Sequence, residues 1–229
     1  MLGQLAAQAA AAGISAPRDA IENHLEVAYG TPAKGDMAGA DTFEILSGYF
    51  KPYAAVRHVH YGAQAALELG NDAPLESIET IDLWTYEEAA TYCGIRQPRT
   101  PLQAQFSLSF GLAAMLRWGD LDPSVYRSPS FEDPLTRALE RKIVIHVEPA
   151  WTQRNVRAAR VRLGLTPGHT VEREVSAVRG DPSLPWSESE LRQKFLTYCR
   201  GSLSEERALS LAHHILEAPL QAAIFPERH

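Results

Sequence analysis

The stretch of sequence that decides the fold is Arg157-Ala-Ala-Arg-Val-Arg-Leu-Gly-Leu-Thr-Pro-Gly-His-Thr-Val-Glu-Arg-Glu-Val-Ser-Ala-Val178. Within this stretch, Arg157 to Leu163 and Thr170 to Val178 are predicted as two β-strands. Thr166-Pro-Gly168 separates the two runs and has the composition of a tight turn. We therefore predict a β-hairpin.

The charges on the two strands indicate the register of this hairpin. A three-residue loop places Arg162 opposite Glu172 and Arg160 opposite Glu174. A two-residue loop instead places Arg162 opposite Arg173. Because opposite charges across a strand pair are favourable and like charges are not, we predict the three-residue register.

Two further segments have strand character. Lys142–Glu148 alternates with Ile143, Ile145 and Val147 on one face, and Ile78–Trp84 is the other strand candidate. We expect the strands to share one antiparallel or mixed sheet. Helical patterns precede, interrupt and follow them, which predicts an α+β fold: a small α+β domain with a hairpin-containing sheet, flanked by N- and C-terminal helices.

The helices are predicted from apolar periodicity and from their start and stop signals. Leu102 to Trp118 is the strongest, largely apolar and followed by Gly119. Ser-x-x-Glu and Thr-x-x-Glu capping boxes mark three other helix starts. The expected helices are Leu2–Ala12 before Gly13, a short one from Pro17, Tyr61 to about Leu69, a brief one capped by Thr85–Glu88, Leu102–Trp118, Ser130 to about Glu140, Ser187–Arg200 and Ser204–Leu216 after the box Ser202–Glu205.

Domain boundaries follow from loops that are rich in glycine and proline. Thr31 to Gly39 is the best boundary candidate, and Gly180-Asp-Pro marks the second. We expect a helical segment at 1–40, the α+β domain at 41–181 and C-terminal helices at 182–229.

Composition limits the class of protein. The chain has 229 residues, 45% of them hydrophobic, a net charge of −6 and a pI near 5.8. This charge argues against a nucleic-acid partner. No apolar run reaches the about 20 residues that a membrane helix needs, and the apolar N-terminus lacks the basic residues of a signal peptide. The two cysteines, Cys93 and Cys199, form no disulfide framework. We expect a cytoplasmic protein.

The segment Phe50 to His60 is the candidate functional site. It brings Lys51, Tyr53, Arg57 and His60 together in an otherwise apolar stretch. Lys51 precedes a proline, which favours an extended backbone, and the helix expected from Tyr61 follows. Because the N-terminus of a helix attracts anions, we interpret the segment as an anion site, with a carboxylate as the anion.

Phe50-Lys51-Pro52-Tyr53, with Arg57, His60 and an Ala-rich helix, resembles a stretch of the MmgE/PrpD family. Its members include 2-methylcitrate dehydratase, cis-aconitate decarboxylase and iminodisuccinate epimerase. Three more stretches agree with the family in the same order, so the resemblance covers almost the whole chain. They are Gln105–Ala113, Gly180–Leu191 with Lys194-Phe195, and the opening Ala-rich helix with Gly13–Pro17.

The resemblance implies the C-terminal half of such an enzyme, with the terminal helices left from an all-α domain. It implies dehydration, decarboxylation or epimerisation of a di- or tricarboxylic acid by proton transfer next to a carboxylate. Lys51 and Arg57 then bind the substrate, while His60 or Tyr53 orients a carboxylate or passes a proton. No metal or organic cofactor is expected, and neither is a membrane or nucleic-acid partner.

Two features set this chain apart from that pattern. Relatives have Tyr-Pro and one or two cysteines where this chain has Tyr53-Ala54-Ala55-Val56, and Phe110 stands where a tyrosine is common. The alternative is therefore a catalytically inactive relic that acts as a binding or interaction module. The first helix is apolar on nearly every face, so we expect the terminal helices to associate with a separately encoded helical subunit or with a second copy of the chain.

Overall fold

A computed structural model describes residues 2–17, 19–30, 44–70, 72–127 and 130–217. The chain divides into two compact units, Met1–Glu44 and Ile45–His229. The first unit contains α1 (Leu2–Ala11) and α2 (Ala20–Tyr29), both of which the sequence predicted. The predicted loop at 31–39 lies outside the described residues.

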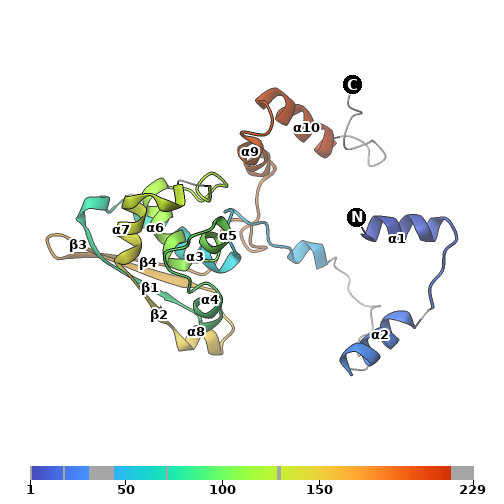
Figure 1. The fold of residues 1–229 in the computed structure, drawn as a ribbon, viewed down its shortest axis with the longest axis horizontal. Coiled ribbons are helices and arrows are strands. Elements are labelled where there is room, and N and C mark those ends of the chain that lie inside the picture. Colours follow the sequence, from blue (N-terminus) through green and yellow to red (C-terminus); the bar gives the residue numbers. More distant parts are fainter. Residues whose placement is uncertain (1, 18, 31–43, 71, 128–129, 218–229) are drawn as a thin grey trace. The chain divides into compact units, whose positions relative to one another are not determined.

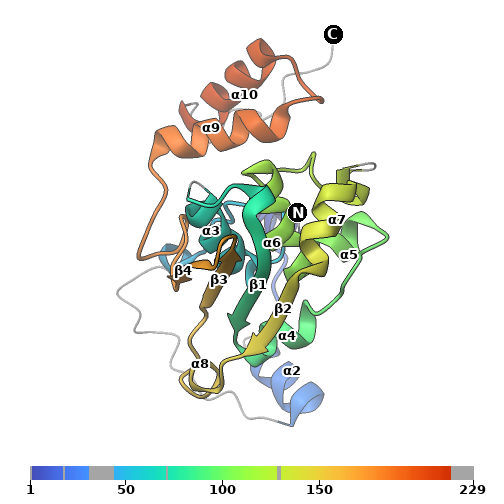
Figure 2. The ribbon, with the colours of Figure 1, turned by 90° about the vertical axis from the view of Figure 1, so that its left-hand side faces the viewer.

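The second unit, drawn with its labelled elements in Figure 1, is built on a four-stranded mixed sheet with the order β2-β1-β3-β4, which can be followed in Figure 2. The central strand β1 is parallel to β2 and antiparallel to β3. The predicted α+β class and the single mixed sheet are confirmed. The strands are β1 (Ile78–Thr85), β2 (Ile143–Val147), β3 (Ala159–Leu165) and β4 (His169–Val175).

The predicted hairpin register is also confirmed. Arg162 is paired with Glu172 and Arg160 with Glu174, across a loop of three residues. The Arg162 guanidinium donates a hydrogen bond of 2.7 Å to the Glu172 carboxylate. The cross-strand charges thus match the register that they predicted.

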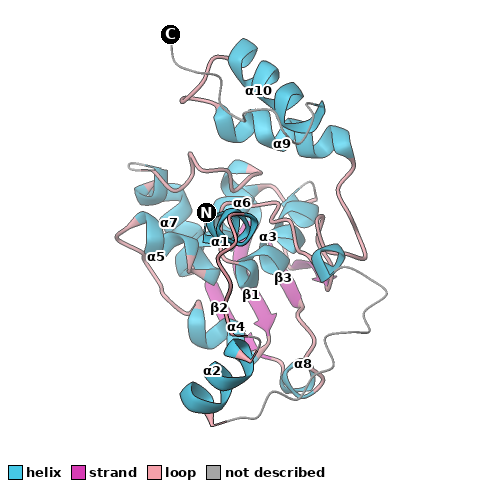
Figure 3. Cartoon of the chain, turned by 90° about the vertical axis from the view of Figure 1, so that its right-hand side faces the viewer, coloured by secondary structure: helices cyan, strands magenta, loops and turns pink. Residues whose placement is uncertain are grey.

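Helices α3 (Arg57–Gly70) and α6 (Leu108–Trp118) cover one face of this sheet. Figure 2 looks onto the strands, and Figure 3 looks from the side of the helices. The two helices approach closely at Gly111, where a Cβ atom would lie 2.2 Å from Val59 Cγ1. The core between the helices and the sheet fixes the N-terminus of α3, next to the Lys51 segment.

Two helix predictions need correction. Helix α3 begins at Arg57 rather than Tyr61, so Arg57 and His60 belong to its first turn. The predicted helix 102–118 is two helices, α5 (Pro101–Gln105) and α6. Ser107 makes the break: its hydroxyl accepts a hydrogen bond from the Phe110 amide and donates one of 2.5 Å to the Ile95 carbonyl.

The predicted caps have mixed outcomes. The Ser187 capping box is confirmed at the start of α9 (Glu188–Cys199). The Thr85 box is wrong, because Thr85 ends β1 and its hydroxyl is directed to the Ala158 carbonyl. At the start of α10 (Glu205–Glu217) it is Ser204, not Ser202, whose hydroxyl accepts from an amide of the first turn.

The remaining helical elements of the described residues are three short helices, a longer C-terminal helix and three 3-10 turns. The predicted helix near Ser130 consists of a 3-10 turn and then α7, whose Asp133 cap accepts from the Thr136 amide. The bounds are α4 (Glu87–Tyr92), α7 (Pro134–Arg141), α8 (Pro149–Gln153), α10 (Glu205–Glu217) and 3-10 turns at Glu44–Ser47, Leu75–Ser77 and Ser130–Glu132.

Candidate functional site

The segment 50–56 is held by backbone contacts to three other parts of the second unit. These contacts fix the path of the chain before α3, which explains why a segment without regular secondary structure has a defined position. The hydrogen bonds are Phe50 N to Gly180 O (3.0 Å), Trp186 Nε1 to Phe50 O (3.0 Å), Ala54 N to Leu121 O (2.9 Å) and Val56 N to Gln105 O (3.1 Å).

A hollow of about 330 Å³ lies beside this segment. Its walls come from the segment itself, from the junction of α5 and α6, and from α9. The residues that line it are Lys51, Tyr53, Ala54, Ala55, Val56, Gln105, Phe106, Lys194 and Tyr198.

Lys51 and Lys194 give this hollow two ammonium groups. Among the described residues, neither has an Asp or Glu oxygen within 4.0 Å. The Lys194 ammonium lies 5.0 Å from the centre of the Tyr198 ring. Partial burial, followed by the charge of Lys51, lowers the pKa of Lys194. The hollow therefore carries positive charge that the surrounding side chains do not neutralise.

Tyr53 contributes a phenol to the wall of the same hollow. Its hydroxyl donates a hydrogen bond of 2.7 Å to Gln64, and the Gln64 amide donates one of 3.1 Å to Glu68. Burial, followed by the charges of Asp120 and Glu68, raises the pKa of Tyr53, so the phenol is protonated at neutral pH. Tyr53 is a hydrogen-bond donor rather than an anion.

A second hollow adjoins the first and shares Tyr53, Lys194 and Tyr198 with it. Three carboxylates line it, and each is held in its own turn. Asp120 accepts from the Leu121 amide, Asp122 accepts from the Ser124 amide and hydroxyl, and Glu190 accepts from Ser187 and pairs with Arg179 at 3.1 Å. Partial burial raises the pKa of Asp120, with Asp122 adding to the rise.

His60 is fully buried in the first turn of α3. One ring nitrogen, Nε2, lies 3.1 Å from the Ala55 carbonyl, and the other, Nδ1, lies 2.5 Å from the Tyr49 hydroxyl. Because a carbonyl only accepts, Nε2 carries the hydrogen and Tyr49 donates to Nδ1. Burial lowers the pKa of His60 to about 4, so the ring is neutral at neutral pH. It packs edge-on against Tyr53 at 5.4 Å between ring centres.

Arg57 is engaged by groups of the same chain. Its guanidinium forms an ion pair of 2.5 Å with Asp181 and donates a hydrogen bond of 3.1 Å to the Tyr61 hydroxyl. It also lies over the Tyr49 ring, 4.1 Å from its centre. Asp181 accepts in addition from the Val178 amide. The Arg57 side chain thus links the first turn of α3 to the turn that contains Asp181.

The four residues that the sequence singled out are therefore divided. Lys51 and Tyr53 line the hollow, whereas Arg57 and His60 do not line it. The expected convergence of Lys51, Arg57 and His60 on one concavity is not seen, because α3 begins at Arg57 and turns His60 into the core.

Sequence reasoning missed Lys194 as a site residue. The sequence does indicate that Lys194 shares one face of a helix with Glu190 and Tyr198, because the three residues are spaced four apart on α9. The Ser187 capping box fixes where that helix begins. Among the described residues, no group of three or more His, Cys, Asp or Glu side chains is placed to hold a metal ion.

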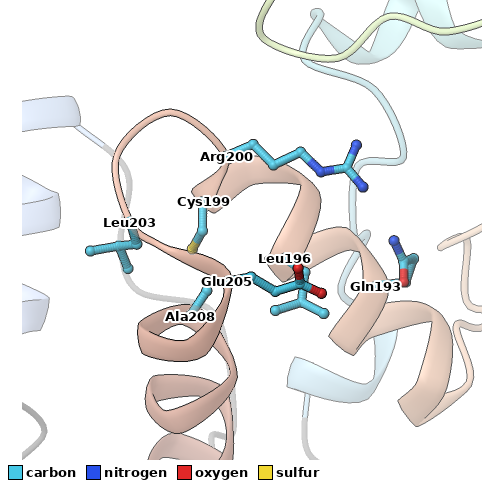
Figure 4. A pocket seen from close by; sticks show the side chains of 7 residues that line it. All are labelled: Gln193, Leu196, Cys199, Arg200, Leu203, Glu205 and Ala208. Atoms are coloured by element: carbon cyan, nitrogen blue, oxygen red, sulfur yellow. The ribbon is translucent and has the colours of Figure 1, made fainter.

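Figure 4 shows another pocket, of about 160 Å³, between α9 and α10. It contains one cation and one carboxylate rather than two uncompensated cations, so it is a weaker candidate for an anion site. Its lining residues are Gln193, Leu196, Cys199, Arg200, Leu203, Glu205 and Ala208.

Comparison with known families shows which family the sequence matches. Residues 53–218 match the MmgE/PrpD C-terminal domain, a range that contains Tyr53, Arg57, His60 and Lys194. A search of curated proteins finds no match. In the part of the chain with described structure, none of the helices combines the length and apolar character that crossing a bilayer requires.

Proposed function

Because the chain belongs to the MmgE/PrpD family, a family of carboxylic-acid lyases, we propose that the Lys51 hollow is the carboxylate-binding part of such an enzyme. The substrate is a di- or tricarboxylic acid. The reaction is dehydration, decarboxylation or epimerisation by proton transfer next to a carboxylate. The observation that carries the proposal is the Lys51 ammonium, which lines a hollow and has no carboxylate partner among the described residues.

Such a site assists this chemistry electrostatically. Removing a proton next to a carboxylate increases the negative charge on that group in the transition state. A fixed cation then stabilises the transition state more than the ground state, which lowers the barrier. Ala55 and Val56, directly before α3, also line the hollow, so the positive end of that helix dipole adds to the effect.

The other site residues take different roles. We assign Tyr53 as the hydroxyl that donates to a substrate oxygen in exchange for Gln64. His60, neutral and buried, is a positioning residue that holds Tyr49 and the Tyr53 ring. Arg57 contributes to substrate binding by fixing the start of α3 rather than through a free guanidinium.

Catalysis on this proposal also requires a helical partner half, and the terminal helices associate either with that separately encoded subunit or with a second copy of the chain. The exposed apolar side chains of α10 support such an association. Leu209, Ile215 and Leu216 are each about half exposed, although Ala208 and Ala212 of the same helix are buried. Exposed apolar patches on otherwise polar proteins commonly mark interaction sites.

The second candidate function is an inactive binding module. The side chains of Ala54, Ala55 and Val56 line the hollow at the position where relatives have a cysteine, and none of the three transfers a proton. On this reading the carboxylate is bound but not converted.

The experiment is turnover of citrate, 2-methylcitrate and cis-aconitate by the chain with and without a helical half from a family enzyme. We expect turnover only in the mixture, lost in Lys51→Met and retained in Arg192→Gln, a matched loss of one charge on α9. Binding without turnover in the mixture supports the inactive module, and the absence of both rejects the proposed function.

A further inference from the structure

The two edge strands of the described sheet differ in how they are protected against pairing with another chain. In the order β2-β1-β3-β4, the strands β2 and β4 each have a neighbour on one side only, and Figure 2 shows β2 beside β1. Natural sheets protect such edges with charged side chains, proline or bulges. The edge strand β4 carries Glu172, Arg173 and Glu174, whereas β2 reads Ile143-Val-Ile-His-Val147 and contains no Lys, Arg, Asp, Glu or Pro. The edge at β2 is therefore the unprotected one.

The backbone of β2 presents hydrogen-bonding groups to this free edge. The Lys142 carbonyl accepts from the Ile81 amide (3.1 Å), and the Glu148 amide donates to the Thr85 carbonyl (2.8 Å). Because successive residues of a strand direct their amide and carbonyl groups to opposite sides, the even-numbered residues of this segment bond to β1. The odd-numbered residues direct theirs to the free edge, where no other described strand pairs with them. They are Ile143, Ile145 and Val147.

The side chains at this edge also favour the addition of a strand. Val144 is 53% exposed and Val147 is 45% exposed, although β2 lies beside the core. Strand addition to a sheet edge gains main-chain hydrogen bonds and covers alternate side chains of the edge strand. An added strand at β2 would thus satisfy backbone groups and bury apolar surface at the same time.

We propose that the free edge of β2 pairs with β2 of a second copy of this chain, antiparallel and about a twofold axis at Ile145. In this register Ile145 lies opposite its own copy, and Ile143 lies opposite Val147 of the partner subunit. Each of these pairs joins two outward-facing residues, which exchange both backbone hydrogen bonds. A shift of the register by two residues in either direction places Val147 opposite Arg141 of α7, or Ile143 opposite Pro149 of α8, neither of which lies in a strand.

The charges at the two ends of β2 favour the antiparallel arrangement. Lys142 directly precedes the strand and Glu148 directly follows it. Antiparallel pairing brings Lys142 near Glu148 of the partner subunit at both ends, whereas parallel pairing would bring like charges together. The Lys142 ammonium donates to the Ile78 carbonyl, and no described carboxylate lies within 4.0 Å of it. The edge is thus complementary to itself in backbone, apolar side chains and charge, as a twofold contact requires.

This contact joins the two four-stranded sheets into one continuous sheet. It uses neither the terminal helices nor the Lys51 hollow. Its presence or absence therefore leaves the proposed function unchanged.

Cysteine cross-linking of the full chain tests the register, in a Cys199→Ser background in which the remaining Cys93 is buried. Ile145→Cys should give a disulfide-linked dimer on oxidation, because paired residues have Cα atoms about 5.5 Å apart, within the range of a disulfide. Val147→Cys is the matched control on the same strand. Its own copy lies about 14 Å farther along the strand, so it should give no cross-linked dimer.

A charge placed at the interface should prevent the cross-link. Val144→Lys, added to Ile145→Cys, puts two ammonium groups beside the twofold axis and should abolish the cross-linked dimer. Thr170→Lys adds the same charge to the other edge strand, β4, and should retain it. Equal cross-linking in these two double variants would contradict the proposed interface.

A second pair of variants covers the case in which Ile145→Cys does not fold. Val144 lies opposite His146 of the partner subunit, so Val144→Cys and His146→Cys chains should cross-link when mixed but not when each is oxidised alone. No cross-link from folded Ile145→Cys, equal cross-linking of Ile145→Cys and Val147→Cys, or no cross-link in the mixture overturns the β2 interface.

Discussion

Gly180 is the residue whose replacement tests the placement of the Lys51 segment. Its φ is +97°, a conformation that residues with a Cβ atom rarely adopt. A Cβ atom here would lie 1.9 Å from the Phe50 carbonyl oxygen and 2.4 Å from Trp186 Nε1. Gly180→Ala must therefore displace the backbone directly before Lys51.

The expected cost has two parts. Holding an L-residue in a left-handed conformation costs about 1–2 kcal/mol. The displacement also weakens two hydrogen bonds, Phe50 N to Gly180 O and Trp186 Nε1 to Phe50 O, each worth about 0.5–1.5 kcal/mol. We expect Gly180→Ala to lower the free energy of unfolding by about 2–5 kcal/mol.

Urea denaturation followed by circular dichroism measures this loss. Gly168→Ala is the matched control, because Gly168 has φ +82° but no atom within 4 Å of its added Cβ. It should lose only the conformational part, about 1–2 kcal/mol. If the two variants lose the same stability, the close approach of Gly180 to Phe50 is not present in solution.

Three further predictions concern buried groups. The Tyr126 hydroxyl is buried with no hydrogen-bond partner among the described residues, so Tyr126→Phe should raise the free energy of unfolding by about 1 kcal/mol in urea titrations, whereas Tyr53→Phe should lower it by a similar amount. The pKa of His60 is lowered from 6.5 to about 4 in the folded chain, so the unfolded chain takes up the proton first as the pH falls. This difference in the pKa of His60 contributes about 3 kcal/mol to the free energy of unfolding, which is complete above pH 6.5 and is lost as the pH falls toward 4. His60→Gln should lack this part of the acid sensitivity. An equal loss of unfolding free energy in the wild-type chain and in His60→Gln would contradict the prediction. Burial raises the pKa of the Cys93 thiol to about 11, so iodoacetamide at mildly alkaline pH should label Cys199 and spare Cys93 until the chain is unfolded, as mass spectrometry can show.

The hairpin was predictable because its signals are local. The Thr166-Pro-Gly168 turn and the charges of Arg162 and Glu172 are read directly from neighbouring sequence, and the register follows. The break between α5 and α6 was not, because the Ser107 hydroxyl donates to Ile95, a contact that exists only after folding. The apolar periodicity of residues 102–118 is the same whether the segment forms one helix or two, so it does not reveal the break.

The candidate site shows the same division. Lys51 was identifiable from its own surroundings, since it precedes a proline within a short cationic segment. The roles of His60 and Arg57 were not identifiable in this way, because they depend on contacts made on folding. Both ring nitrogens of His60 are hydrogen-bonded, to Tyr49 and to the Ala55 carbonyl, and Arg57 is paired with Asp181. Lys194 joins the hollow only through the tertiary position of α9, so sequence proximity gave no reason to group it with Lys51.

The most direct test of the central claim uses the lysines themselves, because the chain has only four: Lys34, Lys51, Lys142 and Lys194. Reductive methylation with ¹³C-formaldehyde preserves their charge and gives each a separate NMR signal, assigned through single Lys→Arg variants. On titration with citrate, we predict saturable shifts of the Lys51 and Lys194 signals with one common dissociation constant. The Lys142 signal should not move, since its ammonium donates to the Ile78 carbonyl. An unchanged Lys51 signal at saturating citrate would contradict the carboxylate site.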